Sequence, residues 1–180
     1  DRRRVNTVFG GGNIDADIMI IGDYPRKIDE DEASPFYEST PPGILLDRYL
    51  RAMGTSRADV WLDLTVCCMP VRVGESWVPR PPNKDEVAAC RDRLHKVISI
   101  VDPKVILLLG AVPLRMAKKW ADVWDKNVAG SRDAISGIAR NDNPPRLVVE
   151  VPGACGPVRY EARATFSPNS VLRMKEGDLN

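Results

Sequence analysis

The chain has 180 residues, of which 43% are hydrophobic and 28% charged, a balance that allows a buried core and excludes a disordered chain or a coiled-coil rod. Its 26 Lys and Arg residues are balanced by 25 Asp and Glu residues, for a net charge of +1, so no overall positive field attracts nucleic acids or membranes indiscriminately. No apolar run approaches the roughly 20 residues that a membrane-spanning helix needs, and no signal peptide is visible.

Strand-like and helix-like patterns alternate along the first half of the chain. Residues 17–22 and 60–66 are short apolar runs that predict buried strands. Between them, hydrophobic residues recur on one side of a helix that we expect to end at Gly54. Asn83 predicts the N-cap of a long helix, with Glu86 able to bond back to it, and the helix should stop before Pro103.

The second half continues the alternation. We expect a strand over 104–110, a helix with Pro113 in its first turn that runs to about residue 120, a mixed and polar segment over 121–146 with a loop at 141–145, and closing strands at 147–151 and 162–166. Repeated strand–helix–strand units predict an α/β protein of three layers, with a central mostly parallel sheet and helices on both faces. Ligands in such proteins bind at the carboxyl ends of the strands, so the segments that follow the strands are the candidates for a site.

Four cysteines, Cys67, Cys68, Cys90 and Cys155, do not form the framework of a small secreted disulfide domain. They are interpreted as buried thiols, with metal ligation as the alternative. The single histidine, His95, is expected on a solvated helix face, and one histidine excludes a multi-histidine zinc site.

Three post-strand segments share an unusual character. Residues 22–36 start with Gly-Asp-Tyr-Pro and end with Ser-Pro-Phe, residues 64–70 end with Cys-Met-Pro, and residues 165–173 end with Ser-Pro-Asn-Ser-Val-Leu-Arg. With Val-Phe-Gly-Gly-Gly-Asn at 8–13, Glu-Val-Ala-Ala-Cys at 86–90 and Pro-Lys-Val-Ile at 103–106, they resemble, in collinear order, the motifs of the uracil-DNA glycosylase superfamily. The resemblance is closest to the iron–sulfur, thermophile-type branch (family 4/5-like). It covers about residues 8–173 and implies the three-layer fold of that superfamily.

The resemblance assigns roles residue by residue. A glycosylase flips the base out of the helix, stacks it on an aromatic ring and reads its polar edge, and the motif positions make Phe36 the stacking ring. Asp23 would stabilise the sugar cation or orient water, with Ser167 as the donor to the departing base. Arg173 would hold a phosphate and Leu172 would wedge into the vacated stack.

Several positions depart from the family pattern. Ser167 stands where the family has His, and a neutral hydroxyl lacks the charge assistance of an imidazolium. Leu64 stands where an Asn reads uracil, and the neighbouring Asp63 would point to the opposite face of the strand. Tyr24 and Arg26 replace small residues and enlarge the side chains around the base-binding pocket. The acidic residues 29–32 are expected to be solvated.

The cysteines also have a counterpart in the iron–sulfur branch. Cys68 and Cys90 match two of the four ligands of its 4Fe–4S cluster, whose other two lie in an upstream Cys-x-x-Cys. The resemblance therefore implies a cluster if such a pair precedes Asp1, and otherwise no cofactor. The absence of an initiator Met is interpreted as a sign that the chain, a single glycosylase-like domain over residues 1–180, is an excerpt of a longer one.

Two functions remain open from the sequence. The first is a DNA-repair glycosylase that excises a flipped uracil or modified base by hydrolysis of the N-glycosidic bond, with altered specificity or reduced activity. The alternative is a non-catalytic, DNA-binding module of a larger replication or phage protein. Either predicts DNA as the partner, a monomeric domain, no membrane, and a cytoplasmic location at the nucleoid or in an infected cell.

Overall fold

The structure is a computed structural model that describes residues 6–72, 79–117 and 128–174, with the side chains of residues 128–133 left out. Its centre is a six-stranded sheet with the order β1-β3-β2-β4-β6-β5. The strands are β1 (Gly11–Gly12), β2 (Ile18–Gly22), β3 (Trp61–Leu64), β4 (Val105–Leu109), β5 (Leu147–Val151) and β6 (Val158–Thr165). The four inner strands run parallel, and β1 and β5 are antiparallel edges. The predicted mostly parallel sheet is confirmed.

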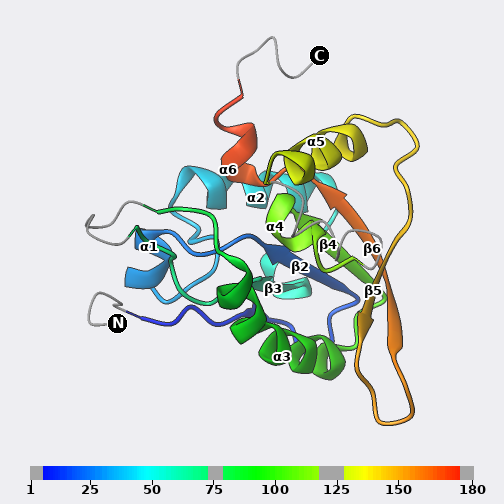
Figure 1. The fold of residues 1–180 in the computed structure, drawn as a ribbon. Coiled ribbons are helices and arrows are strands. Elements are labelled where there is room, and N and C mark those ends of the chain that lie inside the picture. Colours follow the sequence, from blue (N-terminus) through cyan, green and yellow to red (C-terminus); the bar gives the residue numbers. More distant parts are fainter. Residues whose placement is uncertain (1–5, 73–78, 118–127, 175–180) are drawn as a thin grey trace.

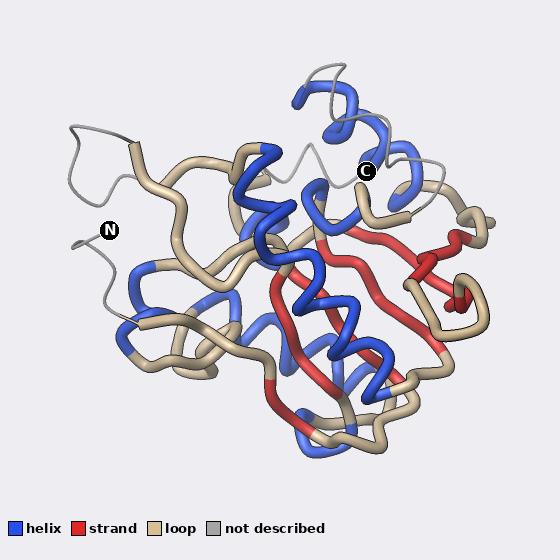
Figure 2. The backbone as a smooth tube through the Cα atoms, turned by 60° about the horizontal axis from the view of Figure 1, so that its bottom comes forward, coloured by secondary structure: helices blue, strands red, loops and turns tan. Residues whose placement is uncertain are grey.

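Helices cover both faces of this sheet (Figure 1). They are α1 (Lys27–Asp31), α2 (Pro41–Ala52), the 3-10 turn η1 (Arg57–Asp59), α3 (Lys84–Val101), α4 (Ala111–Leu114), α5 (Val128–Ala139) and α6 (Pro168–Val171). The long helix α3 lies across one face of the strands, as Figure 2 shows. In the part of the chain that the structure describes, no helix has both the length and the apolar character to cross a membrane.

The alternation of side chains along β2 explains the two cores. Met19 and Ile21 belong to the cluster that contains buried residues of α3, α4 and α5, whereas Ile20 belongs to the cluster on the α2 side. Successive strand residues point to opposite faces, and β2 is central, so both of its faces are covered and buried. The continuous apolar run that predicted this strand is the consequence.

The helix boundaries follow local chemistry. Asn83 caps α3 as predicted: its side chain accepts from the Glu86 backbone N–H at 2.9 Å, and the Glu86 carboxylate accepts from the Asn83 N–H at 2.8 Å. Helix α2 begins earlier than its apolar stripe, at Pro41, because Thr40 caps it through a hydrogen bond from Gly43.

One element of the second half was not predicted. The segment 121–146 is mixed and polar, and only its loop at 141–145 was predicted, but residues 128–139 form α5. The helix was missed because Ile135 and Ile138, three residues apart, are buried in the core cluster against the sheet, and this packing stabilises a helix whose local sequence is mixed. The helix expected to run to about residue 120 is described only as α4, since residues 118–127 lie outside the described part.

Candidate functional site

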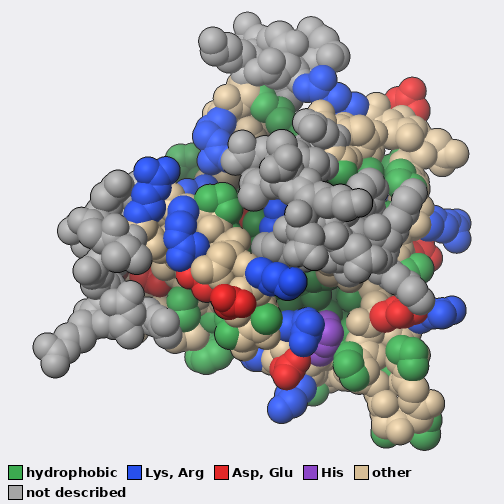
Figure 3. Space-filling model, in the orientation of Figure 1, with side chains coloured by type: hydrophobic (Ala, Val, Ile, Leu, Met, Phe, Trp, Pro, Cys, Tyr) green, Lys and Arg blue, Asp and Glu red, His purple; other side chains and the backbone are tan. Residues whose placement is uncertain are grey.

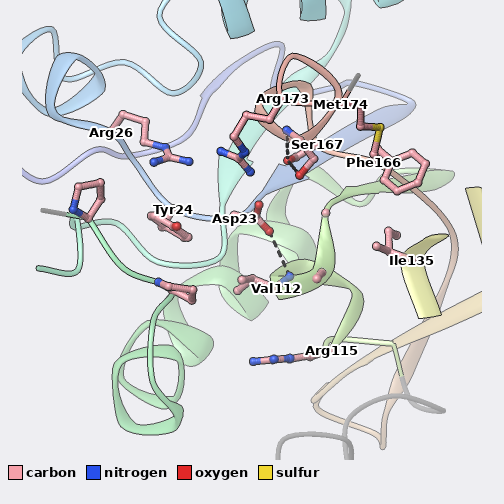
Figure 4. A pocket seen from close by; sticks show the side chains of 15 residues that line it. Asp23, Tyr24, Arg26, Val112, Arg115, Ile135, Phe166, Ser167, Arg173 and Met174 are labelled. Atoms are coloured by element: carbon pink, nitrogen blue, oxygen red, sulfur yellow. Dashed lines mark hydrogen bonds between the residues drawn. The ribbon is translucent and has the colours of Figure 1, made fainter. Parts of the chain in front are cut away.

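A cavity of about 560 Å³ opens where β2, β4 and β6 end (Figure 4). Parallel strands place their carboxyl ends at one edge of the sheet, so the segments after them converge there. Its lining residues are Asp23, Tyr24, Arg26, Pro79, Pro81, Gly110, Ala111, Val112, Arg115, Ile135, Phe166, Ser167, Ser170, Arg173 and Met174. Of the three predicted post-strand segments, the first (22–36) and the third (which ends at 173) line this cavity, and the second does not.

Asp23 lies directly after β2 at the base of the cavity. Its Oδ1 accepts a hydrogen bond from the backbone N–H of Val112 at 3.1 Å. Burial raises the pKa of Asp23 from 3.8 to about 6, against the opposing effects of this hydrogen bond and of the positive charges on Arg26, Arg173 and Arg115. A carboxyl group with a pKa this close to neutrality is typical of a functional site.

A glycine makes the close approach of this carboxylate possible. Gly110 follows β4 with a φ of +110°, and a Cβ at that position would lie 2.6 Å from Asp23 Oδ1. Any side chain at 110 would therefore collide with the carboxylate and would also require a strained backbone. The close contact between the Asp23 carboxylate and the backbone after β4 depends on this glycine.

Three guanidinium groups surround the carboxylate. Arg26 and Arg173 extend into the space above Tyr24 and Asp23, and Arg115 lies beyond Val112 (Figure 4). Basic side chains also gather between α1 and α6 on the face shown in Figure 3. The net charge of +1 thus conceals a local positive region that suits a phosphate backbone. Arg115 was not predicted from the sequence. It could have been, because it lies five residues after the strand predicted over 104–110, in a segment expected to reach the carboxyl edge of the sheet.

Ser167 has a structural task in addition to its position in the cavity. It is buried and caps α6: its Oγ accepts from the Ser170 N–H at 3.3 Å and lies 2.9 Å from the Ser170 Oγ. Capping uses acceptor capacity of the hydroxyl, and its proton is available for a further hydrogen bond when Ser170 Oγ is the donor of the hydroxyl pair.

A second cavity, of about 230 Å³, adjoins the first. Its lining residues are Tyr24, Arg26, Ile28, Asp29, Phe36, Thr40, Pro41, Pro42, Leu64 and Asn169. Tyr24 and Arg26 line both cavities, and the Arg26 guanidinium lies 5.3 Å from the centre of the Tyr24 ring, within the range of a cation–π contact. This pair forms the partition between the two cavities, which we call the charged cavity (about 560 Å³) and the aromatic cavity (about 230 Å³).

Phe36 is held in the aromatic cavity by an unusual backbone. Its φ is +52°, which is rare for a bulky residue and marks a constrained position. Its ring lies against β2 at Gly22, where a Cβ would meet the ring at 2.3 Å. Arg57 fixes the loop by donating to the Phe36 carbonyl at 2.7 Å while it pairs with Asp47 at 2.6 Å.

We expect Arg57→Ala to lower the free energy of unfolding by about 1–3 kcal/mol, because the Phe36 carbonyl and the Asp47 carboxylate both lose their charged partner. Urea unfolding followed by circular dichroism measures the effect. Arg48→Ala, which removes an exposed arginine of the same helix that carries Asp47, is the matched control. Equal losses in the two variants would contradict the assignment of Arg57 to the loop.

The acidic residues after Arg26 were expected to be solvated, and for two of them this was wrong. Asp29 is buried, and its oxygens accept from the Arg26 and Tyr37 N–H groups at 2.8 and 2.9 Å. Glu30 is 1% exposed and accepts from the Met69 N–H at 2.8 Å. Asp29 thus satisfies backbone groups near its own loop, and Glu30 ties the loop to the segment that contains Met69, so neither carboxylate faces solvent.

Asp63 lies away from both cavities. Its carboxylate is fully buried, accepts from Arg93 Nη1 at 3.0 Å through both oxygens, and also accepts from the Leu64 N–H. Arg93 in addition donates to the Leu64 carbonyl at 2.9 Å. Leu64, one residue on, points the other way and lines the aromatic cavity. Asp63 therefore joins β3 to α3, as the strand geometry required.

Leu172 and Arg173 follow α6 at the outer edge of the site. The Leu172 side chain is exposed, with 49% of its surface accessible, and Arg173 lines the charged cavity. Arg173 therefore reaches the charged cavity, while the neighbouring Leu172 side chain is exposed to solvent. Asn169, also from this segment, lines the aromatic cavity and was not singled out by the sequence reasoning.

The cysteines are separate from the two cavities. Cys68 and Cys90 are half-buried, while Cys155, expected to be a buried thiol, is exposed in the turn between β5 and β6. A hydrogen bond with Cys90, together with burial, raises the pKa of the buried Cys67 thiol. Among the described residues no group of three or more metal-binding side chains converges. These thiols do not by themselves make up the four ligands of a 4Fe–4S cluster.

The fold and the placement of these segments agree with the comparison to known families. Residues 9–179 match the family described as "Uracil DNA glycosylase superfamily". The chain therefore belongs to the uracil-DNA glycosylase superfamily.

Among curated proteins, the chain is similar to type-4 uracil-DNA glycosylases of thermophiles. It is 36% identical to that of Thermotoga maritima over 111 residues, 62% of this chain and 54% of that protein. It is 32% identical to that of Pyrobaculum aerophilum over 143 residues, 75% and 67% of the two chains, and 36% identical to that of Saccharolobus solfataricus over 108 residues, 59% and 46%. The alignments thus span about half to two thirds of the length of these relatives.

Proposed function

We propose that this protein is a DNA glycosylase that hydrolyses the N-glycosidic bond of a base flipped out of DNA, with a base preference or rate different from that of its uracil-excising relatives. The observation that carries the proposal is the pairing of two adjoining cavities. One holds Asp23 among three arginines, and the other is walled by Phe36 and Leu64. A glycosylase needs this combination of a charged surface for the sugar–phosphate and a recess with an aromatic wall for the base.

The proposed mechanism divides the reaction between the cavities. The flipped base stacks on the Phe36 ring, and its glycosidic bond passes beside the Tyr24–Arg26 pair to the sugar in the charged cavity. As the glycosidic bond breaks, ionised Asp23 stabilises the positive charge that develops on the sugar and orients the attacking water. Ser167 donates its hydroxyl proton in a hydrogen bond to the departing base, and Arg173 holds a flanking phosphate.

The proposal is tested by incubating the protein with single-stranded and duplex oligonucleotides that carry uracil, 5-substituted uracils or hypoxanthine. Alkali then cleaves the strand wherever a base has been removed. Strand cleavage on at least one of these substrates is expected. Tight DNA binding with no cleavage on any substrate would overturn the enzymatic proposal and favour the alternative, a non-catalytic DNA-binding module of a larger protein. The observation that favours this alternative is the replacement of the family's reading Asn by Leu64.

A phosphate contact by Arg173 predicts a defined salt dependence. In Arg173→Ala the slope of log K against log salt concentration should become shallower by about 1, since one phosphate contact releases roughly one counterion. Fluorescence anisotropy titrations between 50 and 300 mM KCl measure the slope. Lys104→Ala is the control, because Lys104 precedes β4 at the opposite end of the strands and pairs with Asp17. An unchanged slope in the Arg173 variant would exclude this contact.

A further inference from the structure

The aromatic cavity lacks the amide that the family pattern places on the strand, because Leu64 occupies that position. A recess lined only by rings and aliphatic groups would hold any flat base, since stacking does not distinguish one base from another. Discrimination requires a side chain in the recess with hydrogen-bonding groups that are not already in use.

Most polar side chains of this cavity are already occupied. Both oxygens of Asp29 accept backbone N–H groups. The Thr40 hydroxyl donates to the Tyr37 carbonyl at 2.6 Å and accepts from the Gly43 N–H at 3.2 Å. Arg26 lies over the Tyr24 ring, and its guanidinium has donors only, so it cannot accept a proton from a base.

Asn169 is different. It is half-buried at the first turn of α6 and lines the aromatic cavity, and no hydrogen bond of its side-chain amide occurs within residues 6–72, 79–117 and 128–174. An amide offers a donor pair and an acceptor side by side. That arrangement is complementary to a pyrimidine edge on which a carbonyl oxygen adjoins a ring N–H, as O4 and N3–H do in uracil.

We infer that Asn169 reads the polar edge of the flipped base in place of the amide that is missing at position 64. The inference rests on the proposed function, because it assumes that a base enters the aromatic cavity. The –NH2 group of Asn169 donates to the exocyclic carbonyl of the base, and the Asn169 carbonyl oxygen accepts from the ring N–H. Asn169 is a specificity-determining residue of the third post-strand segment, adjacent in sequence to the Ser167–Pro168 pair at the start of α6.

The inference is tested by binding, so that it does not depend on turnover. Two duplexes carry either 2′-fluoro-2′-deoxyuridine or the 2′-fluoro nucleoside of 2-pyridone, whose ring has neither O4 nor N3–H; both resist cleavage of the glycosidic bond and allow Kd to be measured by anisotropy. The wild type should bind the uracil analogue about tenfold more tightly, the discrimination typical of a bidentate contact. In Asn169→Asp the carboxylate can accept the ring N–H but repels O4, so this preference should shrink.

Because the result is a ratio of two affinities, a general loss of DNA binding through the added negative charge cancels. Asn169→Leu, which keeps the volume and removes both hydrogen-bonding groups, should bring the ratio close to 1, and Asn143→Asp in an exposed loop should leave it unchanged. A wild-type preference that persists in both Asn169 variants would overturn this inference alone. A wild type that shows neither a preference nor strand cleavage on any substrate would instead overturn the proposed function.

Discussion

Asp23→Asn is expected to lower the rate of base excision by on the order of 10²–10³-fold, the usual effect of removing a group that acts only in the transition state. Asparagine keeps an oxygen for the Val112 N–H but carries no charge to offset that of the sugar cation. Single-turnover assays with saturating protein measure the rate directly. Asp15→Asn, the same exchange at an exposed residue outside both cavities, is the control, and equal rates in the two variants would remove Asp23 from the mechanism.

The same variant should be more stable than the wild type at neutral pH. The pKa of Asp23 is raised from 3.8 to about 6 in the folded protein, so the folded state binds more protons than the unfolded state between these values. Stability therefore falls as pH rises through this window and stays lower above it. Asp23→Asn removes this loss and should raise the free energy of unfolding at pH 8 by up to roughly 3 kcal/mol, at about 1.4 kcal/mol per pKa unit. The difference should disappear below pH 4.

The rate of base excision by the wild type should rise with pH over the range in which its stability falls. If the ionised form of Asp23 acts on the sugar cation, excision should increase as pH passes through about 6 and level off above pH 7. Bound DNA phosphates shift the midpoint upward, since negative charge near Asp23 disfavours its ionisation.

The second large effect is expected from restoring the two groups that the family pattern contains. Leu64→Asn combined with Ser167→His should increase uracil excision by about 10²-fold or more, because it adds an amide to the aromatic cavity and a donor that can become cationic. The gain should come with a lower stability. Burying an amide costs about 1–3 kcal/mol, and loss of the Ser167 cap of α6 costs about 1 kcal/mol.

The two single variants are the controls for this experiment. Strand cleavage on uracil-containing duplex, corrected for the folded fraction by thermal unfolding, gives the comparison. If the double variant folds and binds DNA but excises no faster than the parent, then residues 64 and 167 do not limit the reaction, and the partition of Tyr24 and Arg26 becomes the candidate for the block.

The parts of the fold that the sequence predicted depend on local patterns. The apolar runs of β2, β3 and β4 and the reciprocal bonds of Asn83 and Glu86 involve neighbours in the chain, so their structure follows from nearby residues. Helix α5 was not predicted, because its stability depends on packing of Ile135 and Ile138 against strands that are distant in sequence.

The site residues that could be predicted are those that belong to the family-like motifs of the sequence. Asp23, Phe36, Ser167 and Arg173 line the cavities at the ends of the strands. The burial of Glu30 depends on the Met69 N–H, 39 residues away, and no local pattern encodes that partner. Asn169 was overlooked for a related reason: its amide, which has no hydrogen bond within the described part of the chain, stands out only when the neighbouring groups of the cavity are seen to be occupied.

Gly22 and Gly110 bear on how such a site diverges. Neither has a side chain that takes part in chemistry, yet one leaves room for the Phe36 ring and the other for the Asp23 carboxylate. Substitutions of side chains that line the cavities, such as those at positions 64 and 167, exchange chemical groups and leave the backbone in place. Substitutions at the two glycines would displace the ring or the acid whatever residue were introduced. The side chains that line the cavities can therefore change during evolution while the fold is kept. Gly22 and Gly110 cannot, because any side chain there would collide with the Phe36 ring or the Asp23 carboxylate.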